Sequence, residues 1–208
     1  MTRLVYLHGF ASSPQSGKAQ FFYRRFAERG LTLQIPQLDR NNFKGLTISG
    51  QLEVVEGEVQ GDPVILIGSS LGGYLAALYA ARHANIERLI LMAPAFQFPQ
   101  RMRGRFSEFD LARWKKEGTR LFFHYAFQSE RPLGYQFVED SALYEGEPDF
   151  RQPALIFHGT RDDVVPAEYS RQFAEGYPNV RLCLMNSGHE LTDVLEPMWA
   201  ETSEFLLR

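Results

Sequence analysis

A serine stands at the centre of a G-x-S-x-G pattern at residues 68–72, and this pattern predicts nucleophilic chemistry. The apolar residues 63–67 before it are typical of a short buried strand, and the Ala-rich residues 73–81 after it are typical of a helix. A sharp turn from strand to helix exposes the hydroxyl of Ser70, and glycine at positions 68 and 72 leaves room for the turn. The helix N-terminus also directs backbone N–H groups towards an oxyanion beside Ser70. Because so short a pattern also arises by chance, catalysis requires partners for this serine.

The first partner to find is an acid, since the expected chain order is serine, acid, histidine. Residues 154–158 predict an apolar strand, and Asp162 and Asp163 follow it in a turn. Open α/β sheets place their sites at the carboxyl ends of the strands, so both carboxylates are candidates. We favour Asp162 as the orienting acid. Asp163 is the alternative, although its place near a helix that begins around Pro166 also suits a capping or turn residue.

The base must be one of five histidines, which are His8, His83, His124, His158 and His189. Only His189 follows the acid, comes after a predicted strand and precedes a predicted helix, so we predict that it is the base. His83 at a helix end and His124 in the middle of the chain are expected to be structural. His158, at the end of a strand, is expected to brace a loop.

A third element is a pair of oxyanion donors, which acyl transfer requires. The N–H of Leu71, directly after the serine, supplies one donor. The other is expected from the loop His8-Gly9-Phe10 after the first strand, at the N–H of Phe10. Taken alone, His8-Gly9 is better explained as a simple tight turn, and only the full set of segments favours the oxyanion role.

Together these segments resemble a known superfamily. The runs LVYLHGFASSP, SGKAQ, IPQLDRNNF, GSSLGGYLAAL, LILMAPA, HGTRDDVVP and SGHEL are similar to those of α/β-hydrolases, and more narrowly to small bacterial YqiA/YcfP-like esterases. The similarity covers nearly the whole chain and is weakest in the middle. It implies that Ser70 is the nucleophile, Asp162 the acid and His189 the base, with Phe10 and Leu71 as oxyanion donors. The motifs are specific to the superfamily and not to any substrate.

Composition fits one globular domain over residues 1–208, with 44% hydrophobic and 23% charged residues. The net charge of −3 and the lack of a basic stripe argue against a nucleic-acid partner. We expect no metal or other cofactor, and no apolar run is long enough to span a membrane. The chain enters a core strand without a leader, so a cytoplasmic location is expected. Cys183, the single cysteine, is expected to be a buried thiol.

Alternating strands and helices predict a parallel sheet covered on both faces, which is a minimal α/β-hydrolase fold with six strands. Strands are expected near residues 3–8, 31–35, 63–67, 88–93, 154–158 and 180–185. Helices are expected near residues 16–29, 48–59, 72–83, 166–176 and 191–207.

Residues 96–153 interrupt this alternation and are rich in aromatic side chains, which argues against disorder and predicts a cap over Ser70. One helix is expected around Trp114, ending at Gly118, while 131–132 and 134–135 predict turns. Most of the rings are expected to form the cap's own core, and others, such as Phe96, to line an apolar acyl pocket. Its cationic residues suit either a solvated face or an anionic substrate such as a CoA ester.

The sequence therefore predicts a serine esterase that hydrolyses carboxylic esters or thioesters through an acyl-enzyme, with a small acyl ester or thioester as its partner. An amidase or peptidase with the same triad is the alternative within enzymes. A non-catalytic binding protein on the same fold is the alternative outside them, although such proteins are expected to lose a triad residue.

Overall fold

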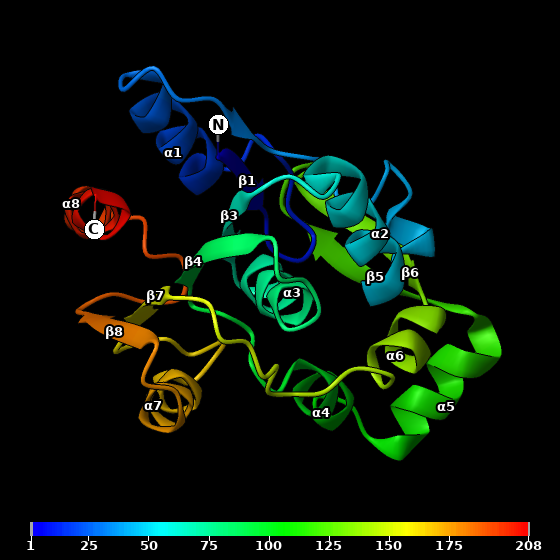
Figure 1. Cartoon of the computed structure of the whole chain (residues 1–208). Helices are drawn as coiled ribbons and strands as arrows, with labels where there is room; N and C mark the ends of the chain where they lie inside the picture. Colours follow the sequence, from blue (N-terminus) through cyan, green and yellow to red (C-terminus); the bar gives the residue numbers. More distant parts are fainter. Residues whose placement is uncertain (1, 208) are drawn as a thin grey trace.

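Six parallel strands form the centre of the computed structural model, which describes residues 2–207 (Figure 1). Their order across the sheet is β2-β1-β3-β4-β7-β8, so the expected six-stranded α/β-hydrolase fold is confirmed. The strands are β1 (Arg3–Leu7), β2 (Leu33–Gln34), β3 (Val64–Ser69), β4 (Ile86–Met92), β7 (Ala154–Gly159) and β8 (Val180–Met185).

Helices cover both faces of this sheet because its strands are apolar on both sides (Figure 1). Along β1, Val5 and Leu7 join the core cluster that contains residues of α2 (Ile48–Val59), α3 (Leu71–Ala80) and α7 (Ala167–Gly176). The alternate residues Leu4 and Tyr6 join a second cluster with residues of α1 (Gly17–Ala27) and α8 (Leu195–Leu207). With both faces of the sheet covered by helices, the loops at its carboxyl edge carry the candidate site.

Between β4 and β7 lies the segment of residues 96–153, which we call the cap segment. It contains α4 (Phe98–Gly104), α5 (Glu108–Glu117), β5 (Thr119–His124), β6 (Ser129–Gly134) and α6 (Gln136–Ser141). Helix α5 is the one expected from the sequence: Ser107 caps its N-terminus, and Gly118 ends it with a φ of 77°. A short 3-10 helix, η1 (Phe43–Gly45), lies against β6.

Strands β5 and β6 form an antiparallel hairpin that corrects the sequence prediction. Residues 131–132 and 134–135 were expected to be turns, but β6 runs through Pro132 to Gly134. Pro132 lies opposite Leu121 of β5. A two-stranded sheet consists only of edge strands, which tolerate a proline because its missing N–H faces away from the partner strand.

Two aromatic side chains of the cap segment are buried in the protein core and do not line a pocket. Phe96 is fully buried and stacks on Phe173 of α7. Trp114 is also buried, and its indole N–H donates to the carbonyl oxygen of Leu133. The expectation that Phe96 lines an acyl pocket was therefore wrong, because α7 closes over its ring.

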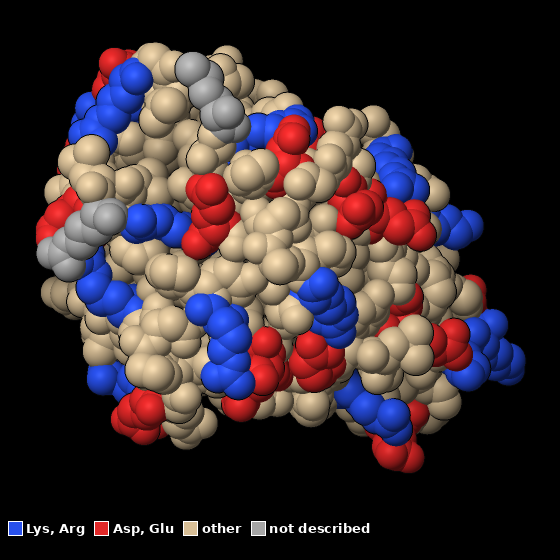
Figure 2. All heavy atoms as spheres, in the orientation of Figure 1, with Lys and Arg blue, Asp and Glu red and all other residues tan. Residues whose placement is uncertain are grey.

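Cys183 is a free thiol that is only partly buried, whereas a buried thiol was expected. Its strand, β8, is the last of the sheet, so no further strand covers it. Acidic and basic side chains are interspersed on the face shown in Figure 2, with no extended area of one sign. Among the described residues, no helix combines the length and the apolar character that a membrane span requires.

Candidate active site

Ser70 lies at the turn from β3 into α3, and its backbone adopts φ 53° and ψ −117°. A positive φ is costly for a residue with a side chain, so the surrounding structure must hold this conformation. A Cβ atom on Gly68 would lie 2.3 Å from the carbonyl oxygen of Gly72, and one on Gly72 would lie 2.0 Å from that of Leu7. Both positions therefore require glycine, as the sequence pattern predicts.

The structure brings Ser70, His189 and Asp162 into one hydrogen-bonded chain. His189 Nε2 lies 3.0 Å from Ser70 Oγ, and His189 Nδ1 lies 2.7 Å from Asp162 Oδ2. The side chain of Asp162 is fully buried and that of His189 is 11% exposed. Since a carboxylate only accepts, Nδ1 carries the proton and Nε2 is free to accept from the serine hydroxyl.

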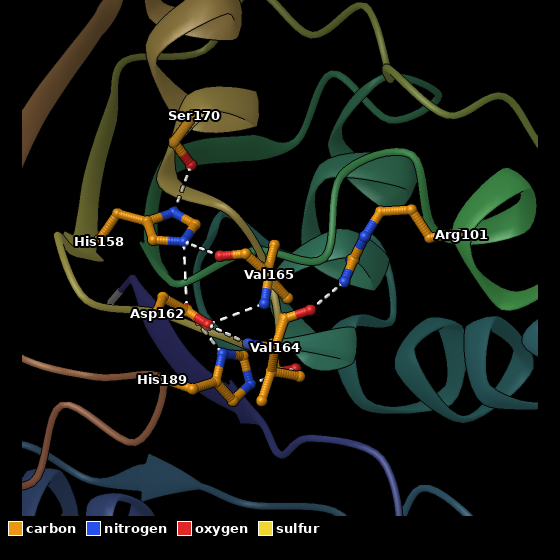
Figure 3. Close-up of polar contacts among 8 residues, drawn as sticks. Arg101, His158, Asp162, Val164, Val165, Ser170 and His189 are labelled. Carbon is orange, nitrogen blue, oxygen red and sulfur yellow. Dashed lines mark hydrogen bonds and ion pairs between the residues drawn. The ribbon is translucent and has the colours of Figure 1, made fainter. Parts of the chain in front are cut away.

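Asp162 is held by donors on both of its oxygens (Figure 3). Oδ1 accepts from the N–H groups of Val164 at 2.9 Å and Val165 at 2.7 Å. Burial alone would raise the pKa of Asp162, but hydrogen bonds from His158, His189 and Val165 outweigh it and hold the pKa well below its usual value. The carboxyl group is therefore ionised throughout the neutral range. Asp163 is exposed, and the structure records no contact between it and His189.

The two expected oxyanion donors belong to segments next to Ser70: Leu71 follows it in the chain, and a Cβ atom on Gly9 would lie 3.5 Å from Ser70 Cβ. Leu71 is the first residue of α3, where backbone N–H groups have no acceptor within the helix. On the other side, His8 Nδ1 lies 3.0 Å from the carbonyl oxygen of Gly9. That contact orients the peptide unit between Gly9 and Phe10, whose other polar group is the N–H of Phe10.

The ring of Phe10 packs among rings of the cap segment and of η1. Its centroid lies 5.7 Å from that of Phe122, 5.5 Å from that of Phe137 and 5.5 Å from that of Phe43. A backbone hydrogen bond from Tyr125 to Ala11, 2.8 Å long, fixes the β5–β6 hairpin to the same loop. The cap segment thus contacts the loop that carries the candidate oxyanion donor.

Several groups near Asp162 were not assigned to the site from the sequence, although His158 was expected to brace a loop. His158 contacts Asp162, and a guanidinium N–H of Arg101 in α4 donates to the carbonyl oxygen of Val164 (Figure 3). Lys18 of α1 is buried, and desolvation lowers its pKa to about 8 although Glu190 and Asp162 favour its charged form. The spacing of His158 four residues before Asp162 was visible in the sequence, but contact through the turn between them depends on the fold. His83 and His124 lie outside the triad.

A large cavity elsewhere on the molecule does not coincide with the triad. It measures about 640 Å³ and is lined by residues of α2, by Tyr79 near the end of α3, and by Arg82, His83 and Tyr144. Its polar groups are paired with protein atoms: Tyr79 donates to Glu56, and Arg82 bonds both carboxylate oxygens of Glu145. We therefore place the candidate active site at Ser70.

Comparison with known proteins agrees with this fold. The model of the family described as "Uncharacterised protein family (UPF0227)" matches residues 3–205, so the chain belongs to that family. The expected resemblance to α/β-hydrolases and to the YqiA-like esterases within them is thereby confirmed.

The relatives with names are also α/β-hydrolases. The AB hydrolase superfamily protein YisY of Bacillus subtilis (strain 168) is 26% identical, over 69% of this chain and 66% of that protein. The structure of Est1E from Butyrivibrio proteoclasticus with bound ferulic acid has a TM-score of 0.86 at 21% identity, covering 100% of this chain and 88% of that one. The mouse alpha/beta hydrolase domain-containing protein 10 has a TM-score of 0.80 at 18% identity, covering 98% and 88%. These likenesses establish the fold and support a hydrolase.

Proposed function

We propose that this protein is a serine esterase that hydrolyses carboxylic esters or thioesters through an acyl-enzyme intermediate. The observation that carries the proposal is the chain from Ser70 Oγ to His189 Nε2 at 3.0 Å and from His189 Nδ1 to Asp162 Oδ2 at 2.7 Å. The strained backbone of Ser70 presents this hydroxyl at the apex of a turn, which is the geometry that a serine nucleophile requires.

In the first half-reaction, Ser70 Oγ attacks the acyl carbonyl carbon while its proton passes to His189 Nε2. The negative charge that develops on the carbonyl oxygen is stabilised by the N–H groups of Phe10 and Leu71. Asp162 keeps His189 in the required tautomer and stabilises its cationic form. The bond from the carbonyl carbon to the alcohol oxygen or thiol sulfur then breaks, and His189 returns the proton to that leaving group.

In the second half-reaction, water takes the place of the leaving group. His189 accepts a proton from the water as its oxygen attacks the acyl-enzyme, and the same two N–H groups hold the second oxyanion. The bond to Ser70 Oγ breaks, the serine recovers its proton, and the free acid leaves. No step in this sequence requires a cofactor.

A covalent serine probe and one variant test the proposal. A fluorophosphonate should label the wild-type protein and not Ser70→Ala, and this variant should lose ester turnover while keeping its fold. Retained hydrolysis by Ser70→Ala would remove the proposal, whatever the substrate. Labelling without turnover of any ester, thioester or amide would favour a binding protein on this fold.

The substrate class is then found with a chain-length series of p-nitrophenyl and CoA esters, together with anilides of the same acids. Since one structural neighbour holds ferulic acid, an ester of an aromatic acid belongs in the series. Faster turnover of the anilides than of the matched esters would support an amidase instead.

A further inference from the structure

A second imidazole contacts the carboxylate of Asp162, on the side away from His189 (Figure 3). His158 belongs to β7 and is fully buried. Its Nε2 lies 3.2 Å from Asp162 Oδ2 and 2.8 Å from the carbonyl oxygen of Val165. Oδ2 is the same oxygen that receives the N–H of His189 at 2.7 Å.

The partners of His158 determine which of its nitrogens carries the proton. Both groups near Nε2 are acceptors, so Nε2 must be the donor. Nδ1 lies 2.7 Å from the hydroxyl oxygen of Ser170, which is buried within α7. With Nε2 as the donor, Nδ1 accepts the hydroxyl proton of Ser170, so Ser170 supports the tautomer that donates to Asp162.

We propose that His158 is a positioning residue for the proposed esterase reaction. Its Nε2–H holds Asp162 Oδ2 against His189 Nδ1 and withdraws negative charge from that oxygen. This inference rests on the proposed function, since it concerns the same triad. His158 is fully buried and its partners are Ser170, Val165 and Asp162, so it acts on Ser70 only through Asp162.

The charge on Oδ2 is then shared between two imidazole donors. Removing the donor at His158 leaves more negative charge on Oδ2, which favours the cationic form of His189. His189 then remains protonated, and unable to accept from Ser70, up to a higher pH. The other charged groups that act on Asp162 are Lys18 of α1 and Arg101 of α4, and both are left in place by a change at His158.

The experiment compares three variants with the wild type. His158→Phe keeps a flat ring and removes both nitrogens. His158→Gln places an amide N–H near the position of Nε2, and Ser170→Ala removes the hydroxyl that donates to Nδ1. His83→Gln is the control, because His83 lies beyond the end of α3 and has no contact with the triad. Turnover is normalised to the fraction of protein labelled by the fluorophosphonate.

We expect His158→Phe to lower kcat by roughly tenfold to a hundredfold, which corresponds to one hydrogen bond to a charged group. Its acid limb of activity should move to higher pH, and Ser170→Ala should move the limb in the same direction by less. His158→Gln should restore most of the activity and the wild-type limb. A loss of packing alone would reduce the labelled fraction without moving the limb.

Wild-type activity per labelled site and an unmoved limb in His158→Phe would overturn the inference. Where His158→Phe fails to fold, the position of the proton on the His158 ring of the wild type decides the question. Long-range proton–nitrogen NMR of the histidine rings adds a test without turnover: His158 is expected as the Nε2–H tautomer, and the Nδ1–H tautomer contradicts us. Inactive Ser70→Ala beside unaffected His158 variants would defeat this inference and leave the proposed function standing.

Discussion

Phe96, just after β4, lies almost parallel to Phe173 of α7, with the two ring centroids 4.3 Å apart and an interplanar angle of 17°. Phe150 extends the stack, since its centroid lies 5.4 Å from that of Phe173. These rings join the cap segment to the helix that follows the acid loop. They belong to the protein core, and an acyl chain has no access to Phe96.

Phe96→Ala should therefore destabilise the protein by about 3–5 kcal/mol, the usual result of truncating a buried phenylalanine. The order of preference among acyl lengths should remain that of the wild type. Denaturant unfolding and the ester series measure the two effects, and Phe109→Ala, at a ring that is 74% exposed, is the control. A changed acyl preference with unchanged stability would contradict this assignment.

Phe122 of β5 contacts the ring of Phe10, whereas its neighbour Phe123 is exposed. Phe122→Ala should lower kcat for all esters alike, because the loop that carries the Phe10 N–H loses one side of its support. The loss should be up to about tenfold, below the 10²–10³ that follows removal of an oxyanion donor. Phe123→Ala should keep the wild-type kcat per labelled site, and equal losses in both variants would mean that the contact with Phe10 is irrelevant.

Asp162→Asn should lower kcat by several orders of magnitude, since it removes the negative charge that orients His189 and stabilises its cation. The control is Asp163→Asn, at an exposed neighbour, which should retain activity near that of the wild type. Both are measured with one ester at saturating concentration. A larger loss in Asp163→Asn would show that the acid assignment is shifted by one residue.

Activity should rise from acid to neutral pH, because only neutral His189 accepts the proton of Ser70. Asp162 contributes nothing to this limb, since its pKa is held well below its usual range. The measurement is kcat/KM between pH 5 and 8 with an ester whose leaving group does not titrate there. A flat profile would point to a different base or to a limiting step outside the chemistry.

Two buried histidines connect stability with pH. Desolvation lowers the pKa of both His8 and His124, and neither ring nitrogen of His124 has a hydrogen-bond partner among the described residues. The unfolded chain therefore binds protons that the folded chain excludes. The stability that these two neutral histidines contribute is fully present above about pH 6.5, the ordinary pKa of histidine. It is lost as the pH falls from there towards their folded-state pKa.

His124→Leu should accordingly reduce the fall of Tm between pH 7 and pH 5, because the unpartnered imidazole is replaced by an apolar side chain. Thermal unfolding at several pH values measures this slope. The same slope in His124→Leu and the wild type would place the titrating groups elsewhere.

The sheet and the arrangement of Ser70, Asp162 and His189 were predictable because their signals are local. The turn at Ser70 needs Gly68 and Gly72 within two residues of it, and Asp162 and His189 each follow a recognisable strand. The β5–β6 hairpin was missed because Pro132 normally argues against a strand, and the sequence does not reveal that both strands are edges.

The support of the triad was not predictable in the same way. The contact from His158 to Ser170 forms only when α7 packs against β7, and the stack of Phe96 on Phe173 depends on the same packing. Neither contact lies within one helix or one turn, so no periodicity in the sequence reports it.

The position of the cap segment between two neighbouring strands of the sheet has a consequence for how the protein can evolve. The segment leaves at the end of β4 and returns at the start of β7, and these two strands are paired neighbours. Any crossover between them need only span the length of one strand, and doubling a flexible connection costs only about 0.6 kcal/mol. Insertion, deletion or replacement of the cap segment can therefore change which ligand the protein binds. The strands β3, β7 and β8 meanwhile keep Ser70, Asp162 and His189 in place. A replacement has to reproduce the contacts that hold the segment against the sheet, of which the hydrogen bond from Tyr125 to Ala11 is one.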